Sequence, residues 1–332
     1  MNKRLDEKLA RLQSGRATAR DFILADAKDA DMAFGIASPG RGKSLAQYRE
    51  QIREIVRQDV VDIMLMSAST LEQLAIEEKL FDKSPVTPAA RANDTTDIWI
   101  VRGGTYAQQP SRPFRSATID HIKYGRLASN STAPVVGADL GLYSMTFTND
   151  IERDLRTLEA FQAFRLEAEQ KRFRYFLEVF NPNVATGLSA QENAAFLNDH
   201  IVRALAGITR SGRPLFLKIP YNGPAALEEL ASYDSSLIVG ILGGGAGTTL
   251  DAFQLIHDAQ KHGARVALFG RKINHSEHPL TFIQYLRRIT DGEIAPAEAV
   301  RAYHRDLAKL NLAPHRSLEA DLRLETHLAS HG

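Results

Sequence analysis

The chain has 332 residues, of which 44% are hydrophobic and 24% charged, a balance typical of a globular protein with a large core. Its 41 basic and 40 acidic residues leave a formal charge of +1, which argues against nucleic acid as a partner, and the absence of cysteine excludes disulfides and thiolate chemistry. The first nine residues are too charged for a signal-peptide core, and no run reaches the roughly 18 apolar residues of a membrane span, so we expect a cytoplasmic protein that contacts no membrane.

Short apolar or alternating runs predict eight strands, and nearly all are followed by a helical pattern. In chain order the predicted strands are Phe22–Ala25, Val61–Met66, Ile98–Arg102, Val135–Leu140, Tyr175–Val179, Leu215–Ile219, Leu237–Leu242 and Arg265–Phe269. Ser189 and Glu192 form an S-x-x-E capping box that marks the start of one helix. Pro85 and Pro88 predict a loop over residues 83–97.

Strand followed by helix repeats along the chain. Such alternation implies a parallel sheet, because each crossover needs a helix to return the chain to the same end of the sheet. Eight units fit an α/β fold of the (β/α)8 TIM barrel type that takes in residues 1–332 as a single domain. We expect an N-terminal helix within residues 1–20 and extra C-terminal helices over residues 279–332. An open, doubly wound sheet is the alternative fold.

A lysine inside an apolar strand is the leading candidate for chemistry. Catalytic groups of (β/α)8 barrels lie at the C-terminal ends of strands, and Lys218 is found there, on the face opposite Leu217 and Ile219. A lysine held out of water favours its free amine, which attacks carbonyl groups to form an iminium. Glu178 ends the preceding strand and is a candidate to move protons or to bind a substrate hydroxyl. An ion pair with only a structural role explains the same pattern.

Two other predicted strand ends carry polar candidates. Asp26 and Lys28 belong to a group of four charges after the first strand and are candidates to contact substrate oxygens. Asp139 and Tyr143, at the end of the fourth predicted strand, are candidates for substrate binding and proton transfer, since a tyrosine can pass a proton to a carbinol oxygen. A charged loop and ordinary packing, respectively, are the alternatives.

Glycine-rich turns follow the last two predicted strands. Gly243, Gly244 and Gly245 come after the seventh strand, and Gly270 and Arg271 after the eighth. The loops after strands seven and eight form the usual phosphate site of these barrels, where bare backbone N–H groups meet the anion and an arginine adds a bidentate contact. The run does not match the G-x-G-x-x-G dinucleotide motif. The turns therefore predict phosphate binding, with tight strand–helix packing as the alternative.

Three of these segments resemble the class I aldolase superfamily of deoxyribose-phosphate, tagatose-bisphosphate and archaeal-type fructose-bisphosphate aldolases. Phe176-Leu-Glu-Val and Phe216-Leu-Lys-Ile-Pro are similar to the glutamate and lysine strands of tagatose-bisphosphate aldolases, and Leu24-Ala-Asp-Ala-Lys28 resembles their first strand. The resemblance implies that the lysine forms a Schiff base, that the glutamate acts as acid and base, that the aspartate contacts substrate, and that the glycine turns bind phosphate. It also implies a homo-oligomer.

The sequence therefore predicts a class I aldolase, a lyase that reversibly cleaves a phosphorylated ketose through a Schiff base on Lys218, with Glu178 and Tyr143 moving protons. No cofactor is needed for this chemistry. We expect no metal site, because His275 and His278 have no third ligand and lack the H-E-x-x-H spacing. A sugar-phosphate isomerase or epimerase without a covalent intermediate, and a noncatalytic barrel that binds a phosphorylated ligand, are the alternatives.

Overall fold

Eight parallel strands form a closed barrel in the computed structural model, which describes residues 2–34, 36, 43–127, 133–245 and 247–326. The order around the ring is β8-β7-β6-β3-β2-β1-β10-β9, and a parallel bridge from Ile219 to Ile241 joins β8 to β9. The barrel strands are β1 Ile23–Lys28, β2 Ile63–Met66, β3 Thr87–Arg91, β6 Leu140–Thr146, β7 Arg174–Phe180, β8 Leu217–Lys218, β9 Gly240–Leu242 and β10 Val266–Phe269. A short antiparallel pair, β4 Asp94–Thr95 and β5 Pro113–Phe114, is inserted between β3 and β6.

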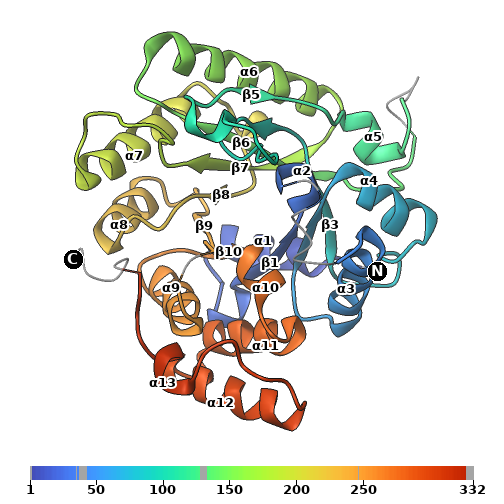
Figure 1. The fold of residues 1–332 in the computed structure, drawn as a ribbon. Helices are drawn as coiled ribbons and strands as arrows, with labels where there is room; N and C mark the ends of the chain where they lie inside the picture. The colour runs from blue at the N-terminus through green and yellow to red at the C-terminus, as the bar shows by residue number, and fades with distance from the viewer. Residues whose placement is uncertain (1, 35, 37–42, 128–132, 246, 327–332) are drawn as a thin grey trace.

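Helices surround the barrel, as Figure 1 shows. Those before and between the strands are α1 Arg4–Gln13, α2 Ala30–Phe34, α3 Leu45–Gln58, α4 Ala68–Leu71, α5 Ile119–Tyr124, α6 Ile151–Gln170, α7 Ala190–Ala206, α8 Pro224–Tyr233 and α9 Thr249–Lys261. Shorter turns are η1 Ala19–Asp21, η3 Glu72–Glu77, η4 Tyr106–Gln108 and η5 Arg210–Gly212. The predicted capping box at Ser189 and Glu192 starts α7.

Four more helices follow the last strand: α10 Arg271–His275, α11 Pro279–Thr290, α12 Pro296–Lys309 and α13 Leu318–Asp321. Helix α11 packs against α3 and α9 and so takes the place of the eighth barrel helix, while α12 covers α9 and α11 from outside. The predicted (β/α)8 barrel with extra C-terminal helices is therefore confirmed.

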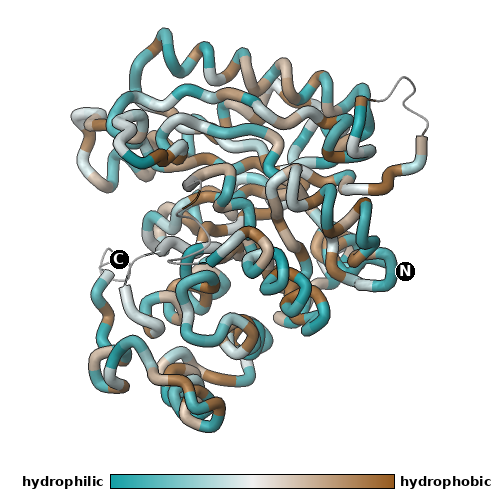
Figure 2. The backbone as a smooth tube through the Cα atoms, turned by 45° about the vertical axis from the view of Figure 1, so that its right-hand side comes forward, coloured by the Kyte–Doolittle hydropathy of each residue, from teal (hydrophilic) through white to brown (hydrophobic). Residues whose placement is uncertain are grey.

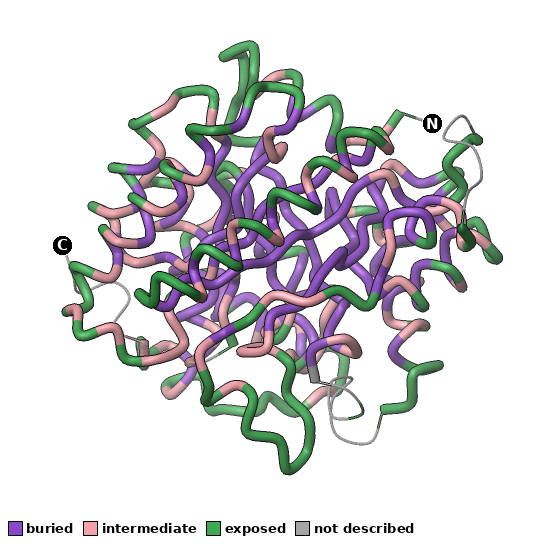
Figure 3. The backbone as a smooth tube through the Cα atoms, turned by 90° about the horizontal axis from the view of Figure 1, so that it is seen from above, coloured by how far each residue is buried: buried purple, intermediate pink, exposed green. Residues whose placement is uncertain are grey.

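Alternation along the strands divides the core into two layers. Side chains such as Ile23, Leu142 and Phe176 fill the inside of the barrel, while their strand neighbours, such as Leu24 and Leu177, pack outward against the helices. In Figure 2 the apolar segments lie at the centre of the molecule, and in Figure 3 the same region is the buried one, with exposed backbone around it. Both faces of the strands are therefore apolar, except at their ends.

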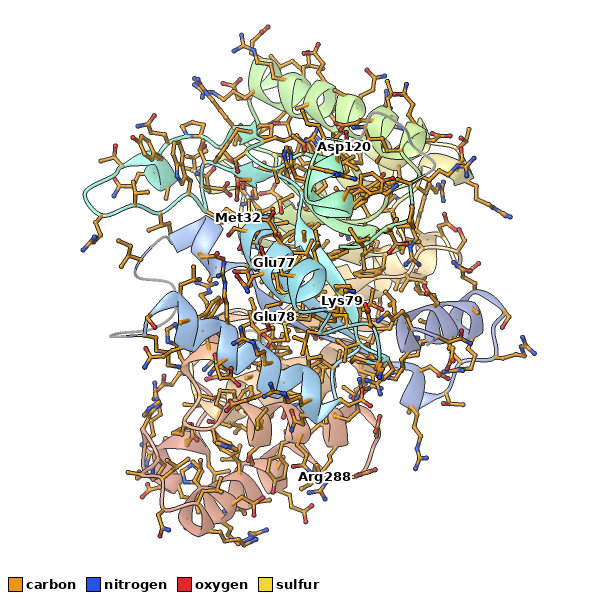
Figure 4. The ribbon with its side chains drawn as sticks, turned by 90° about the vertical axis from the view of Figure 1, so that its right-hand side faces the viewer. Met32, Glu77, Glu78, Lys79, Asp120 and Arg288 are labelled. Carbon is orange, nitrogen blue, oxygen red and sulfur yellow. The ribbon has the colours of Figure 1, made fainter. Side chains whose placement is uncertain are left out.

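Helix α1 closes the N-terminal end of the barrel, which we call the floor. Its Leu5 and Leu9 belong to the inner core. Asp62, buried just before β2, accepts hydrogen bonds from Arg4 Nε (2.8 Å), Lys8 Nζ (2.9 Å), Arg287 Nη2 (2.7 Å) and the Leu24 backbone N–H (2.8 Å). One carboxylate therefore connects α1, β1, β2 and α11. In Figure 4 α1 lies at the right edge, opposite the segment with β4 and β5, which extends at the left beyond the C-terminal end of the barrel, the mouth.

The third strand is not where the sequence pattern predicts it. The barrel uses Thr87–Arg91, inside the expected loop, whereas Ile98–Arg102 lies in the excursion between β4 and β5 with Trp99 38% exposed. Pro88 is tolerated in β3 because β3 first pairs with β6 at Ala90, so the missing N–H of the proline has no ladder partner to lose. Trp99 stacks on Tyr106 with the ring centroids 4.8 Å apart instead of entering the barrel core.

The fourth strand begins later than predicted. Only Leu140 of the expected Val135–Leu140 belongs to β6, which runs on to Thr146. The shift carries Asp139 to the floor, where it pairs with Arg174 Nη2 at 2.9 Å. It also brings Ser144 to the mouth.

Candidate active site

Three neighbouring strands place Ser144, Glu178 and Lys218 side by side inside the barrel. The register pairs Ser144 with Glu178 and Glu178 with Lys218. Lys218 Nζ lies 2.6 Å from Glu178 Oε1, and Ser144 Oγ donates to Glu178 Oε2 at 2.7 Å. Lys218 is 6% exposed and Glu178 1%. The predicted meeting of lysine and glutamate thus occurs, in a setting with little water.

A buried arginine on β3 extends this row across the lumen. Arg91 Nη1 donates to Ser144 Oγ at 3.2 Å, its Nε donates to Asp29 Oδ2 at 2.5 Å, and its Nη2 lies 3.9 Å from Glu178 Oε2. Asp29 follows β1 with only 5% of its surface exposed. The charges of Asp29, Arg91, Glu178 and Lys218 therefore form one connected network at the mouth.

Arg91 also lies near a further carboxylate, that of Asp94. Asp94 Oδ1 lies 3.9 Å from Arg91 Nε, and Asp94 is 3% exposed. Burial raises the pKa of Asp94 to about 6, against the attraction of Arg91 and with repulsion from Asp29 and Asp31 adding to the effect. Within the part of the chain that the structure describes, Asp94 Oδ1 has no hydrogen-bond donor. Asp94 Oδ1 is thus a buried oxygen whose hydrogen-bonding capacity is unused within the described residues.

The excursion between β4 and β5 is anchored over the mouth at β6 and β7. Asp97 accepts hydrogen bonds from Thr146 Oγ1 and Ser111 Oγ, each at 2.8 Å. Asn183, after β7, donates its side-chain amide to the carbonyl oxygens of Ala107 (3.1 Å) and Gln109 (2.7 Å). The excursion thus covers one side of the mouth without placing Trp99 in the lumen.

Asp26 and Lys28 lie on the outer face of β1 and do not reach the lumen. Both are fully buried, with Lys28 Nζ 3.5 Å from Asp26 Oδ2. Lys28 also donates to Asn274 of α10 and to Gln51 of α3, so the pair faces the helices. Burial raises the pKa of Asp26 to about 6, against the pull of Lys28. The two residues predicted to contact substrate thus lie on the helix-facing side of β1, because alternation turns Asp29, instead of its even-numbered neighbours, inward.

Tyr143 also faces away from the candidate site. Its ring stacks on Phe164 of α6 with the centroids 4.4 Å apart and is 1% exposed. Burial raises the pKa of its phenol well above the usual value. Ser144, one residue further along β6, occupies the inward position instead. With Asp139 at the floor, neither residue predicted on the fourth strand is brought to Lys218.

The two glycine turns lie next to each other, as the sequence predicts. A Cβ on Gly270 would lie 2.8 Å from the Ala27 carbonyl oxygen, so this position requires glycine, and a Cβ on Gly245 would lie 2.7 Å from Arg271 Nε, so a larger residue there would displace the arginine. Arg271 is exposed, and none of the described acidic side chains forms an ion pair with it. Its guanidinium therefore packs on bare backbone and keeps its donors free for an anion.

A pocket of about 180 Å³ adjoins Gly245 and Arg271. Its charged and titratable lining residues are Arg271, Lys272, His275, Glu277, His315, Arg316 and Asp321. The two carboxylates are already engaged: Asp321 accepts from the Thr249 backbone N–H at 2.7 Å, and Glu277 accepts from Tyr303 Oη at 3.0 Å. Arg271, Lys272 and Arg316 thus bring three cations to the pocket beside the glycine turns, and Arg316 also pairs with Glu325 of the C-terminal segment.

Among the described residues, no group of three or more histidine, cysteine, aspartate or glutamate side chains could hold a metal ion. None of the described helices has both the length and the apolar character needed to cross a bilayer.

Comparisons with solved structures give the same barrel. An archaeal fructose-1,6-bisphosphate aldolase whose catalytic lysine is bound to the carbinolamine intermediate aligns with a TM-score of 0.63 and 16% identity, over 87% of this chain and 100% of that one. The fructose-bisphosphate aldolase from Slackia heliotrinireducens aligns with a TM-score of 0.65 and 14% identity, over 91% of each chain. This chain has the fold of the archaeal aldolases. At this identity the likeness is one of fold.

A third solved structure, a Schiff-base-forming fructose-1,6-bisphosphate aldolase, has a TM-score of 0.62 and 14% identity over 86% of this chain and 99% of that one. A scan of the sequence against protein-family models and a search of curated proteins found no match. The archaeal-type aldolase fold is therefore recognised from three-dimensional structure.

Sequence reasoning did not single out Asp29, Arg91, Asp94 or Ser144 as site residues. Asp29 was within the noted group of charges, and its odd-numbered spacing from Ile23 and Ala25 is the signal that would have found it. Arg91 and Asp94 fall in the segment expected to be a loop because of its prolines. Ser144 is missed because the predicted fourth strand ends at Leu140, which leaves Ser144 outside the predicted barrel.

Proposed function

We propose that this protein is a class I aldolase that reversibly cleaves a phosphorylated ketose through a Schiff base on Lys218. The observation that carries the proposal is the buried contact of 2.6 Å between Lys218 Nζ and Glu178 Oε1 at the mouth of an aldolase-type barrel. A carboxylate at this distance can take a proton from the ammonium and leave a free amine beside the substrate carbonyl.

The proposed reaction begins when the Lys218 amine adds to the ketone carbon to form a carbinolamine. Glu178 returns its proton to the carbinol oxygen, and water leaves as the iminium forms. The iminium accepts the electron pair of the breaking carbon–carbon bond while a base removes the proton of the substrate hydroxyl, which becomes the aldehyde. Protonation of the resulting enamine and addition of water then release the ketone product and restore the lysine.

The network around Glu178 supports this role. Ser144 Oγ donates to Glu178 Oε2 at 2.7 Å, and the Arg91 guanidinium lies 3.9 Å from the same oxygen. These contacts orient the carboxylate so that its other oxygen faces Lys218. Glu178 therefore needs little reorganisation to exchange a proton with the amine or with an oxygen bound to the ketone carbon.

The glycine turns are the proposed phosphate site. Arg271 packs on Gly245 and forms no ion pair with a described acidic side chain, and the adjoining pocket also includes the cations Lys272 and Arg316. A phosphate held there would lie at the end of β9 and β10, next to the strand that carries Lys218. This arrangement would fix the ketone in register with the amine.

Reductive trapping tests the proposal. The protein is incubated with borohydride and dihydroxyacetone phosphate or a longer ketose phosphate, and peptide mass mapping then locates the added mass. We expect the modification at Lys218 and its loss in Lys218→Met. Lys28→Met is the matched control, because it removes a buried lysine outside the lumen and should leave trapping at Lys218 intact.

A different result would change the assignment. Turnover of a sugar phosphate that survives Lys218→Met would favour an isomerase or epimerase that works without an imine. Thermal stabilisation by ketose phosphates with neither trapping nor turnover would indicate a binding protein instead.

A further inference from the structure

The part of the mouth formed by the ends of β1, β2 and β3 is acidic, and β1 adjoins β10, which one of the glycine turns follows. Asp29 follows β1, Asp31 is in α2, and Asp94 follows β3. Asp31 Oδ2 accepts from Ser67 Oγ at 2.6 Å, and Ser67 follows β2. Carboxylates therefore gather at the ends of β1, β2 and β3, across the lumen from Lys218.

Arg91 is the cation near Asp29, Asp94 and Glu178, while Asp31 is attracted by Arg49. Arg91 contacts Asp29 at 2.5 Å and lies 3.9 Å from both Asp94 and Glu178. A single guanidinium cannot neutralise three carboxylates, and Lys218 is already paired with Glu178. Among the described residues, these three carboxylates thus outnumber the two cations that lie within 4 Å of them, in a setting from which water is largely excluded.

Asp94 indicates that this excess is built for a ligand. Its residue is 3% exposed, and among the described residues nothing donates a hydrogen bond to its Oδ1. A buried carboxylate oxygen without a donor costs free energy, which a bound hydroxyl or ammonium group would recover. A phosphate at the same place would meet like charge instead and would be repelled.

The two sides of the mouth thus differ in the sign of their charge. Gly245 and Arg271 border a pocket beyond β9 and β10 whose lining includes the cations Arg271, Lys272 and Arg316, and Asp29, Asp31 and Asp94 lie near the ends of β1 to β3. Lys218 lies between the two sides around the ring of strands. Its strand, β8, pairs with β7 at Glu178 on one edge and is bridged to β9 on the other. A substrate stretched across the mouth would meet one anion site and one site for hydrogen-bond donors.

We propose that the aldehyde partner of this aldolase carries no phosphate and is bound through a hydroxyl or ammonium group that donates to Asp94. This inference rests on the proposed function. In the synthetic direction the enamine carbon on Lys218 bonds to the aldehyde carbon, the aldehyde oxygen takes up a proton to become a hydroxyl, and water hydrolyses the iminium. The product is a ketose with a single phosphate at the ketone end.

Aldol synthesis with dihydroxyacetone phosphate as the fixed donor tests the inference. We expect kcat/KM for glyceraldehyde to exceed that for glyceraldehyde 3-phosphate by at least about tenfold, the ratio that one unfavourable charge contact supports. A comparison of 3-aminopropanal with 3-hydroxypropanal shows which group donates the hydrogen bond to Asp94. A higher kcat/KM for 3-aminopropanal assigns the ammonium group, and a lower one assigns the hydroxyl. Asp94→Asn should reduce the preference for the unphosphorylated aldehyde several-fold.

Controls separate this inference from the proposed function. Asp139→Asn, at the floor, should leave the ratio of the two aldehydes unchanged, and borohydride trapping of the donor at Lys218 should be unaffected by Asp94→Asn. Normal trapping with glyceraldehyde 3-phosphate as the better substrate, or with a ratio that Asp94→Asn does not alter, would overturn the inference and leave the aldolase proposal standing. Absence of trapping with every ketose phosphate would overturn both.

Discussion

Glu178 and Lys218 are register partners on neighbouring strands, and their charged groups meet at 2.6 Å inside the barrel. The pairing depends on backbone hydrogen bonds between β7 and the segment of β8, such as that from the Leu177 N–H to the Phe216 carbonyl oxygen. Removing one partner leaves the other as an uncompensated charge in a site with little access to water. Stability and chemistry therefore depend on the same contact.

Glu178→Gln should slow turnover by about 10²- to 10⁴-fold, because an amide cannot exchange the proton that the carbinolamine requires. Single-turnover measurement of imine formation would locate the loss in that step. Ser144→Ala is the graded comparison: it removes one hydrogen bond to Glu178 and should cost roughly tenfold or less. Equal rates for Glu178→Gln and the parent protein would rule out Glu178 as the proton carrier.

Asp94→Asn should stabilise the fold at neutral pH while it impairs aldehyde selection. Since the pKa of Asp94 rises from 3.8 to about 6 on folding, the folded state holds this proton more tightly, and the carboxyl group destabilises the fold progressively as the pH rises between these values. Asparagine removes that penalty. The gain should be on the order of 1 to 3 kcal/mol at pH 7.5 and small at pH 4.

Urea unfolding of both proteins across this pH range measures the effect of Asp94→Asn. The groups that share the field of Asp94 are Arg91, Asp29 and Asp31, so the same titration on Asp31→Asn shows how much of the effect belongs to the cluster. A stability difference that does not grow with pH would mean that folding does not raise the pKa of Asp94.

Asp62→Ala should destabilise the protein by about 3 to 5 kcal/mol, because it leaves Arg4, Lys8 and Arg287 with no common acceptor at the floor. Chemical denaturation gives the change in the free energy of unfolding. The matched control is Asp59→Ala, which removes an exposed carboxylate that also pairs with Arg4 and should cost about 1 kcal/mol or less. Similar losses in the two variants would show that Asp62 does not organise the floor.

Arg271→Ala should raise KM for the phosphorylated ketone at least about tenfold, with a smaller effect on kcat, because the arginine binds the phosphate without touching the reacting carbon. Steady-state kinetics at two salt concentrations separates this contact from general electrostatics. Arg57→Ala, on the exposed side of α3, is the control and should leave KM unchanged. An unchanged KM in Arg271→Ala would place the phosphate elsewhere.

The sequence predicts the barrel because its signal is repeated. Strand–helix alternation recurs through the chain, so one misplaced strand does not alter the fold. Val61–Met66 and Tyr175–Val179 lie over β2 and β7, since both are apolar runs of branched and aromatic residues. The third strand is missed because Thr87–Arg91 contains a proline and two alanines, while the more strand-like Ile98–Arg102 is used on the surface.

The candidate site is predictable only where strand ends are predicted correctly. Lys218 and Glu178 are found because β7 and β8 are, and the glycine turns because β9 and β10 are. Since side chains alternate between lumen and helices, an error of one residue exchanges the two faces. Odd-numbered and even-numbered residues of β1 therefore face opposite sides, so Asp29 faces the lumen while Asp26 and Lys28 face the helices. Composition contains no information about this alternation.

The floor carboxylate also determines when the barrel can be completed during synthesis. Asp62 binds Arg4 and Lys8, which leave the ribosome before it, and Arg287, which follows 225 residues later. Until α11 has emerged, the nascent chain has a carboxylate with only part of its cationic shell and a first strand without its neighbour β10. The N-terminal half therefore remains open until nearly the whole chain is made, and chaperones have that interval in which to bind it.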